Sequence, residues 1–115
     1  MKSLMIVFFC AVTFSLQAQS PIDGVWNTRK DNSKIEITQT GDSWTGKLKS
    51  SNNKNAKIGK VILKDLKKSG DHWVGKIYVT RRDRWFDVKV FPKSNALELK
   101  VNAGFRSRTI EWTKG

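Results

Sequence analysis

Apolar and polar residues alternate along most of this chain, in short runs that Gly, Asn, Asp and Ser separate at near-regular spacing. Alternation with a period of two places the apolar side chains on one face of a β-strand. The pattern therefore predicts an all-β chain without helices. The eight predicted strands are residues 24–29, 34–39, 43–50, 59–66, 72–80, 84–92, 96–102 and 106–113.

Short polar segments join these predicted strands. Residues 40–42 and 69–71 are examples, because their side chains tolerate a positive φ or hydrogen-bond to their own backbone. Segments of this kind predict antiparallel hairpins between consecutive strands. Residues 51–57 form the one longer connection, and since they are rich in Asn and Lys we expect a mobile surface loop there.

The apolar residues of matching parity form one face that the folded chain must bury. An open sheet of eight strands would leave two exposed edges, whereas an antiparallel up-and-down barrel leaves none, and we therefore predict a barrel. Its interior either is filled by side chains or holds one small ligand. Four inward tryptophans favour a filled interior. The predicted core is Trp26, Ile35, Ile37, Trp44, Leu48, Trp73, Ile77, Val79, Phe86, Val88, Val90, Leu97, Leu99, Val101, Ile110 and Trp112.

One short sequence occurs twice. GDSWTGKL at residues 41–48 returns as GDHWVGKI at residues 70–77. A single pair is too little for a repeat architecture, which needs at least three copies, so it indicates two equivalent hairpins in one sheet. We expect Gly46 and Gly75 either to make space beside bulky rings or to bend their strands.

The first 18 residues have the order of a secretory signal peptide. Lys2 gives a positive start, residues 4–14 are almost wholly apolar, and cleavage is predicted after Ala18. The apolar run is shorter than the roughly 20 residues that span a bilayer, so we expect no transmembrane segment in the mature chain. Residues 19–115 then form one barrel domain of an exported protein, periplasmic or extracellular.

Several stretches of the mature chain resemble one bacterial family. The strand-opening Gly24-Val25-Trp26 is similar to the Gly-x-Trp opening of calycin-type barrels. The segments at 59–66, 73–78 and 105–114 resemble an exported family called domain of unknown function 2147. This resemblance covers essentially the whole mature chain and implies a secreted or periplasmic, calycin/lipocalin-like barrel with no agreed activity. Residues 79–86 depart from the family pattern, which has an Asp-Pro turn and a Gly-Lys-x-Tyr step there.

The residue types argue against an enzyme. His72 is the only histidine, and its parity is opposite to that of Trp73, which places it on the polar face of a strand. Without a cysteine in the mature chain, a metal site would need Asp and Glu ligands, and Asp42 and Asp71 are better explained as turn residues. No glycine-rich phosphate loop leads into a helix. We therefore expect no catalytic residue, metal or cofactor.

The charge balance is the more informative feature. The chain has 22 basic and 10 acidic residues, for a net charge of +12, and many lysines fall on outward strand positions that favour solubility. Arg81, Arg82, Arg84 and Trp85 instead concentrate charge and an aromatic ring at one predicted hairpin tip. Guanidinium groups bind phosphate and carboxylate, and an exposed ring can stack on a ligand. Trp85 has the parity opposite to that of the core residue Phe86, so it should face outward together with an exposed Phe91.

These features support two functions. The first is a non-catalytic binding module that contacts an anionic lipid or glycan of the cell envelope through the Arg81 to Trp85 tip. The alternative is a lipocalin-like carrier of a small hydrophobic ligand inside the barrel, which a wide cavity would favour. Nucleic-acid binding fits the charge, but export argues against it. The oligomeric state stays open.

One structural contact is also predicted. Arg108 shares parity with Ile110 and Trp112 and so points toward the interior, where an unpaired charge is costly. The ring of Trp26, on the first strand, would offset part of that cost through a cation-ring contact. We expect Trp26 and Arg108 to pack together where the first and last strands close the barrel.

Overall fold

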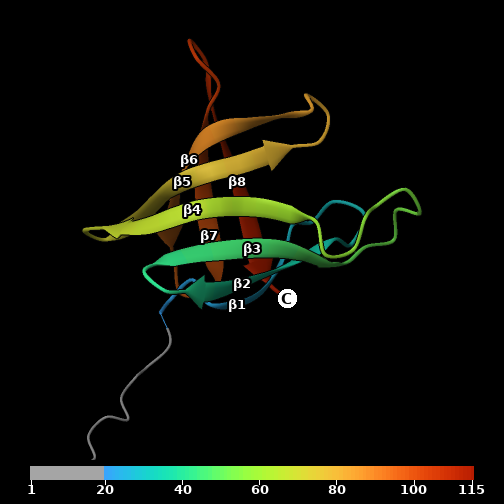
Figure 1. Ribbon diagram of the computed structural model, residues 1–115, viewed down its shortest axis with the longest axis horizontal. Helices are drawn as coiled ribbons and strands as arrows, with labels where there is room; N and C mark the ends of the chain where they lie inside the picture. Colours follow the sequence, from blue (N-terminus) through green and yellow to red (C-terminus); the bar gives the residue numbers. More distant parts are fainter. Residues whose placement is uncertain (1–19) are drawn as a thin grey trace, which may run out of the picture.

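The computed structural model describes residues 20–115, so the predicted signal peptide lies outside the described residues. Eight antiparallel strands pair in chain order, and the last returns to the first to close a barrel (Figure 1). This confirms the predicted fold class. The strands are β1 (Gly24–Asn27), β2 (Lys34–Thr40), β3 (Ser43–Ser50), β4 (Val61–Ser69), β5 (His72–Val79), β6 (Arg84–Pro92), β7 (Ala96–Asn102) and β8 (Ser107–Lys114). Within residues 20–115, no helix is long and apolar enough to cross a bilayer.

The alternating sequence produces the barrel wall directly. In β7, Leu97, Leu99 and Val101 are buried inside, while Lys100 between them is exposed. Most of the predicted core is buried as expected. Val79, Phe86 and Ile110 are only partly buried, although they pack against the buried cluster.

Strand β4 breaks the alternation. Leu63 and Leu66 are both fully buried although they are three residues apart, because the pairing of β4 with β5 shifts between Lys64 and Lys67. Asp65 takes up the extra residue with a φ of 55°. An added residue that rotates the following side chains to the other face is a β-bulge. Parity therefore failed to identify these two leucines as core.

Gly46 and Gly75 lie on the two neighbours of β4 and make room for its leucines. A Cβ added at Gly46 would lie 3.1 Å from the Cβ of Leu63, and one added at Gly75 would lie 2.9 Å from the Cα of Leu66. The prediction that these glycines create space is confirmed. The groups that need the space are the backbone and leucines of β4 and, beside Gly46, the side chain of Ile35; no aromatic ring is among the nearest atoms.

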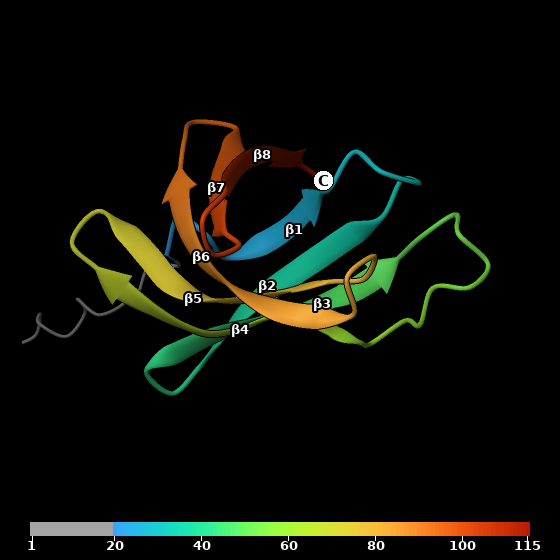
Figure 2. The ribbon, with the colours of Figure 1, turned by 90° about the horizontal axis from the view of Figure 1, so that it is seen from above.

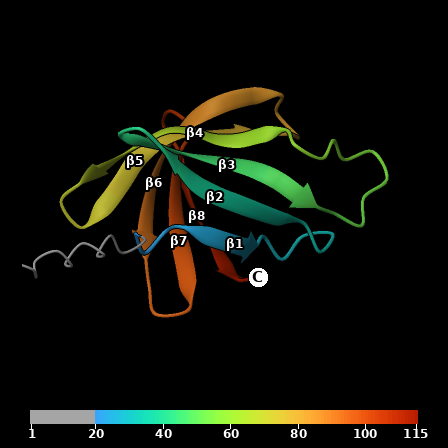
Figure 3. The same cartoon turned by 60° about the horizontal axis from the view of Figure 1, so that its bottom comes forward.

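The barrel closes through a short contact. Strand β1 pairs with β8 only at Trp26 opposite Lys114 and Asn27 opposite Thr113. Figure 2 shows β7, β8 and β1 curving round toward one another, and Figure 3 shows the end of β1 beside the C-terminal end of β8. Lys114 places its Nζ atom 4.8 Å from the centre of the Trp26 ring.

The predicted contact between Trp26 and Arg108 is thus corrected. Arg108 lies near the start of β8, opposite Val101 of β7, and its side chain is exposed. Each strand residue adds about 3.3 Å, so the six positions between Arg108 and Lys114 separate them by roughly 20 Å along the strand. The stagger of β8 relative to β1 determines which basic side chain lies over the Trp26 ring. The alternation of apolar and polar residues along a strand does not predict this stagger.

The two ends of the barrel differ. Strand direction alternates, so the tight turns 41–42, 70–71 and 93–95 lie at one end together with residues 20–23, and we call this the closed end. Ile22 is fully buried there, and the indole Nε1 of Trp26 donates a hydrogen bond to the Ile22 carbonyl oxygen at 3.0 Å. Residues 20–23, which were not among the predicted core residues, therefore cover the closed end of the barrel.

The longer connections lie at the opposite end, which we call the open end. They are residues 28–33, 51–60, 80–83 and 103–106. The interior is filled at the closed end and hollow at the open end, where a cavity of about 690 Å³ lies between the first three of these connections and the strands. The expectation of a filled interior is therefore wrong for this half of the barrel.

Candidate ligand-binding site

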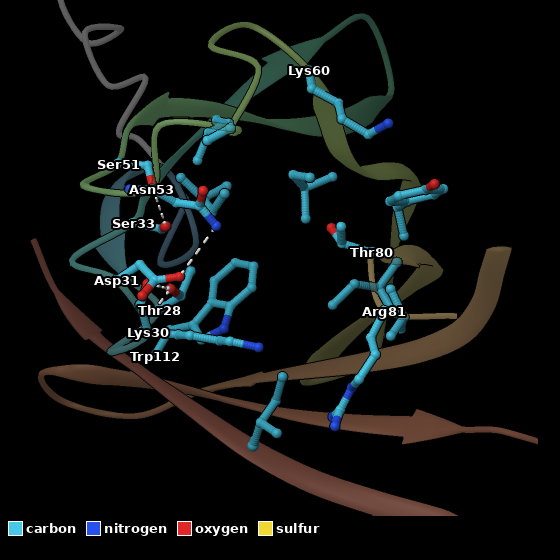
Figure 4. A pocket seen from close by; sticks show the side chains of 18 of the residues that line it. Thr28, Lys30, Asp31, Ser33, Ser51, Asn53, Lys60, Thr80, Arg81 and Trp112 are labelled. Atoms are coloured by element: carbon cyan, nitrogen blue, oxygen red, sulfur yellow. Dashed lines mark hydrogen bonds between the residues drawn. The ribbon is translucent and has the colours of Figure 1, made fainter. Parts of the chain in front are cut away.

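The cavity has an aliphatic wall. Its apolar residues come from six strands and one loop, and Trp112 of β8 adds an indole (Figure 4). They are Ile35, Leu48, Ala56, Ile62, Ile77, Val79, Val101, Ile110 and Trp112. Clefts of about 300 to 1,000 Å³ with mainly apolar walls are typical of small-molecule sites. Partial burial of Val79 and Ile110 follows from their position at this hollow.

Polar side chains surround the mouth of the cavity. Hydroxyl and amide groups alternate there with charged groups, and Figure 4 shows Lys30 extending past Trp112 toward the middle of the cavity. The uncharged polar residues are Thr28, Ser33, Ser51, Asn53, Asn55, Tyr78 and Thr80; the charged residues are Lys30, Asp31, Lys57, Lys60, Arg81 and Arg108. Among residues 20–115 no charged side chain is buried, so these cations stay hydrated at the mouth while their stems border the cavity.

Hydrogen bonds fix one side of this mouth. The hydroxyl oxygens of Ser33 and Ser51 lie 2.7 Å apart, and the Asn52 amide nitrogen donates to the Asp31 carbonyl oxygen at 2.9 Å. Asp31 holds a φ of 55°, a region that Asp and Asn visit more readily than most residues. The loop at 51–60, whose residues 51–57 were expected to form a mobile surface loop, is thus tied to the loop at 28–33. Gly59 anchors its other end by donating its N–H to the Leu48 carbonyl oxygen at 2.7 Å.

The four residues of the predicted tip do not form one surface. Arg81 lines the cavity, whereas Arg82 places its guanidinium carbon 5.6 Å from the centre of the Phe86 ring. Arg84 begins β6 and is exposed. Trp85 is half-buried on the wall of the barrel.

Neighbours cover the ring of Trp85. Tyr78 meets it edge to face at 5.4 Å between ring centres, and the Nζ of Lys64 lies 4.2 Å from its centre. The predicted pairing with Phe91 does not form, because Phe91 stacks on His72 at 4.7 Å, several residues along β6. Trp85 is therefore a poor stacking platform for a ligand.

The turn that carries Arg81 and Arg82 is held by its own hydrogen bonds. The Tyr78 hydroxyl donates to the Asp83 carboxylate, and this bond raises the pKa of Tyr78 above its ordinary value, with a smaller contribution from desolvation. The Asp83 amide also donates to the Val79 carbonyl oxygen at 2.8 Å. The turn therefore presents Arg81 to the cavity in a defined direction.

His72 lies away from the cavity. Its ring stacks on Phe91 of β6, and its Nδ1 lies 3.1 Å from a carboxylate oxygen of Asp71. This hydrogen bond, with one from the backbone of Asp71, holds the pKa of the Asp71 carboxyl below its usual range. Within residues 20–115, no three His, Cys, Asp or Glu side chains form a group that could hold a metal ion.

Phe105 is a surface feature that the sequence analysis missed. It is 98% exposed in the turn between β7 and β8, with Gly104 before it and Arg106 after it. In the sequence, Phe105 stands out only as part of the segment 105–114 that resembles the family. A phenylalanine beside a glycine in a predicted turn was the signal available, since no strand face could bury it.

Comparison with known proteins gives a family and a fold. The model of a family described as "Uncharacterized protein conserved in bacteria (DUF2147)" matches residues 24–114. Among solved structures, protein HP1028 from Helicobacter pylori, described as belonging to the lipocalin family, is similar with a TM-score of 0.64 and 20% sequence identity. The alignment covers 81% of this chain and 82% of that chain. No curated protein matches. The predicted resemblance is confirmed, and the structural likeness supports the lipocalin-like fold.

Proposed function

We propose that this chain, which belongs to the DUF2147 family of uncharacterised bacterial proteins, is a non-catalytic carrier of a small amphipathic ligand. The observation that carries the proposal is the cavity of about 690 Å³ at the open end of the barrel. A lipocalin-like barrel that is closed at one end and hollow at the other is suited to hold the apolar part of a ligand away from water. The cavity therefore favours the lipocalin-like carrier, the second function expected from the sequence, over binding through the Arg81 to Trp85 tip.

The wall of the cavity determines the body of the ligand. Ile35, Leu48, Ile77 and Val101 present only aliphatic carbon, and a polar group among them would lose its hydrogen bonds to water without replacement. Each square ångström of apolar ligand surface buried here contributes about 25 cal/mol. The body is therefore a hydrocarbon chain or a small apolar ring system.

The mouth determines the head of the ligand. Five cations surround it, Lys30, Lys57, Lys60, Arg81 and Arg108, against one carboxylate. Guanidinium groups form paired hydrogen bonds with carboxylate and phosphate, and these charge-assisted bonds are stronger than neutral ones. The ligand consequently carries an anionic head group, in keeping with the anionic lipid expected from the sequence.

A comparison of two probes tests this proposal. Dodecanoate and dodecanol share a hydrocarbon chain and differ in the charge of the head. Isothermal titration calorimetry should show dodecanoate binding to the chain that begins at Gln19 and weaker binding of dodecanol. Equal affinities for both would contradict the anionic head group.

A matched pair of substitutions locates the probe. Val101→Trp fills the cavity from β7 and should abolish dodecanoate binding, whereas Val74→Trp makes the same change on the exposed wall of β5 and should not. Circular dichroism checks that both variants fold. If Val101→Trp does not fold, Ile110→Trp at the half-buried edge of the cavity replaces it. Binding that survives in the folded variant would exclude the cavity.

Export is part of the proposal. Residues 1–18 have the order of a signal peptide, and this order supports export of the carrier to the periplasm or outside the cell. Intact-mass analysis of the processed protein should give a chain starting at Gln19. A product that still contains Cys10 would contradict the cleavage site.

A further inference from the structure

The charges of this barrel are divided between its two ends. The four connections of the open end carry eight basic and two acidic residues, the latter being Asp31 and Asp83. Of the eight basic residues, only Arg29 forms an ion pair within residues 20–115, with Glu111 at 3.4 Å. The eight are Arg29, Lys30, Lys54, Lys57, Lys60, Arg81, Arg82 and Arg106.

The turns of the closed end have the opposite balance. With the segment 20–23 they carry three acidic residues, Asp23, Asp42 and Asp71, and one basic residue, Lys93, which pairs with Glu98 of β7 at 3.7 Å. At physiological salt the field of a surface charge extends only about 8 Å. Lys67 and Lys68 near the end of β4 and Lys114 at the end of β8 also border the closed end, and the Nζ of Lys67 lies 4.0 Å from a carboxylate oxygen of Asp42. Charges of both signs are therefore mixed at the closed end, whereas the connections of the open end are strongly basic.

Two exposed apolar side chains lie in connections of the open end. The large apolar residues exposed among residues 20–115 are Phe105 at 98%, Ile58 at 62% and Val74 at 37%. The two most exposed lie in open-end connections, and the β7–β8 turn that carries Phe105 projects from the top of the barrel in Figure 1. The ring of Phe105 is not buried by the fold and is therefore available for a contact outside the chain.

We propose that the open end docks on a bilayer surface rich in anionic lipids, with Phe105 inserted between head groups and the basic connections against lipid phosphates. Phenylalanine on a projecting turn enters the apolar boundary of a bilayer, while each cation close to an anionic surface adds to the attraction. The proposal extends the carrier function, because docking brings the cavity mouth onto the source of anionic amphiphiles. The docking surface itself, however, does not require an occupied cavity.

A bilayer fits these observations better than an anionic polymer or a folded protein does. The cations lie on four separate connections, and four of them, Lys30, Lys57, Lys60 and Arg81, line the cavity, instead of following a groove along which a polymer chain would run. Phe105 projects from the surface, and a projecting apolar side chain needs a soft apolar layer rather than a preformed pocket. Lipid interfaces provide that layer together with a high density of phosphate.

Vesicle co-sedimentation tests the docking. The chain that begins at Gln19 contains the whole barrel and should sediment with vesicles of phosphatidylcholine and phosphatidylglycerol, but not with phosphatidylcholine alone. Replacing Arg82 and Arg106 by Ser should weaken binding roughly thirtyfold, which is about fivefold for each cation near the surface. Replacing Lys89 and Lys93 by Ser, away from the open end, removes the same charge and should change binding little.

A second pair of variants tests the inserted ring. Phe105→Ser should weaken vesicle binding roughly tenfold, because the ring no longer leaves water. Val74→Ser, on the exposed wall of β5, should leave binding unchanged. Both positions are exposed, so neither change disturbs the core, and circular dichroism provides the check.

The outcomes separate docking from ligand binding. Three outcomes would each overturn the docking proposal. They are equal binding to neutral and anionic vesicles, equal effects of the two members of a variant pair, and binding to dextran sulfate but not to anionic vesicles. The cavity variant Val101→Trp should keep vesicle binding, and its loss from folded protein would overturn docking as well. Failure to bind dodecanoate together with intact vesicle binding would instead contradict only the carrier function.

Discussion

Trp44 and Trp73, which occupy the same position in the two copies of the repeated GD-x-W sequence, meet edge to face at the closed end with ring centres 5.7 Å apart and planes at 82°. The Nε1 of Trp44 donates to the Asp23 carboxylate at 2.8 Å, whereas the buried Nε1 of Trp73 has no partner within residues 20–115. The two equivalent hairpins therefore contact each other across the interior, and only one of the two indoles is fully satisfied.

This asymmetry predicts different costs for the same substitution. Trp44→Phe removes a hydrogen bond to a carboxylate, which is worth about 1.5 to 3 kcal/mol. Trp73→Phe removes a buried indole N–H that has no acceptor. Since this polar group no longer has to be buried, the free energy gained offsets part of the packing energy that the smaller ring loses. We expect Trp44→Phe to lower the free energy of unfolding by about 2 kcal/mol more than Trp73→Phe does. Urea denaturation measures both, and equal losses would contradict the asymmetry.

The glycines beside β4 should also differ. A Cβ at Gly75 would lie 2.6 Å from the Lys64 carbonyl oxygen, which is backbone, whereas one at Gly46 would meet only side chains of Ile35 and Leu63, at 3.0 Å or more. Side chains can shift more easily than a paired strand. We therefore expect Gly75→Ala to cost about 3 kcal/mol or more and Gly46→Ala about 1 kcal/mol. Thermal unfolding of the two variants checks the order, and a larger loss for Gly46→Ala would contradict it.

The cation on Trp26 gives a test of barrel closure. Lys114→Ala removes a cation from the ring face and should lower the free energy of unfolding by about 0.5 to 1 kcal/mol, since Lys114 is exposed. Arg108→Ala should leave stability nearly unchanged and should instead weaken dodecanoate binding, because Arg108 lines the cavity. Urea denaturation and calorimetry separate the two effects. A larger stability loss for Arg108→Ala would restore the pairing expected from the sequence.

The hydrogen bond between Tyr78 and Asp83 predicts a pH dependence. Because the pKa of Tyr78 is raised in the folded chain, the folded state holds the phenolic proton more tightly than the unfolded state does. This contribution to stability is present below the ordinary tyrosine pKa of about 10 and is lost as the pH rises through the higher folded value. Tyr78 is the only tyrosine, so tyrosinate absorbance reports on it alone. Asp83→Ala should move the titration midpoint down toward 10, and an unchanged midpoint would contradict the bond.

Much of this fold follows from the sequence because strand formation is local. Alternation with a period of two identifies each strand and its inner face, and short polar turns dictate that consecutive strands pair. These rules correctly place Leu97, Leu99 and Val101 in the core. The GD-x-W repeat likewise identifies two hairpins and two glycines with a spatial role.

The candidate site depends on relations between strands, which local patterns do not contain. The bulge at Asp65 puts Leu63 and Leu66 on one face, the stagger of β8 brings Lys114 to Trp26, and Ile22 plugs one end. Each of these follows from how the closed sheet is sheared and coiled. The sequence by itself determined eight strands with an apolar face. Only the tertiary structure decided that Trp26, Trp44 and Trp73 fill one half while Trp112 borders the hollow half, because the volume left inside a barrel depends on where along each strand the large side chains meet.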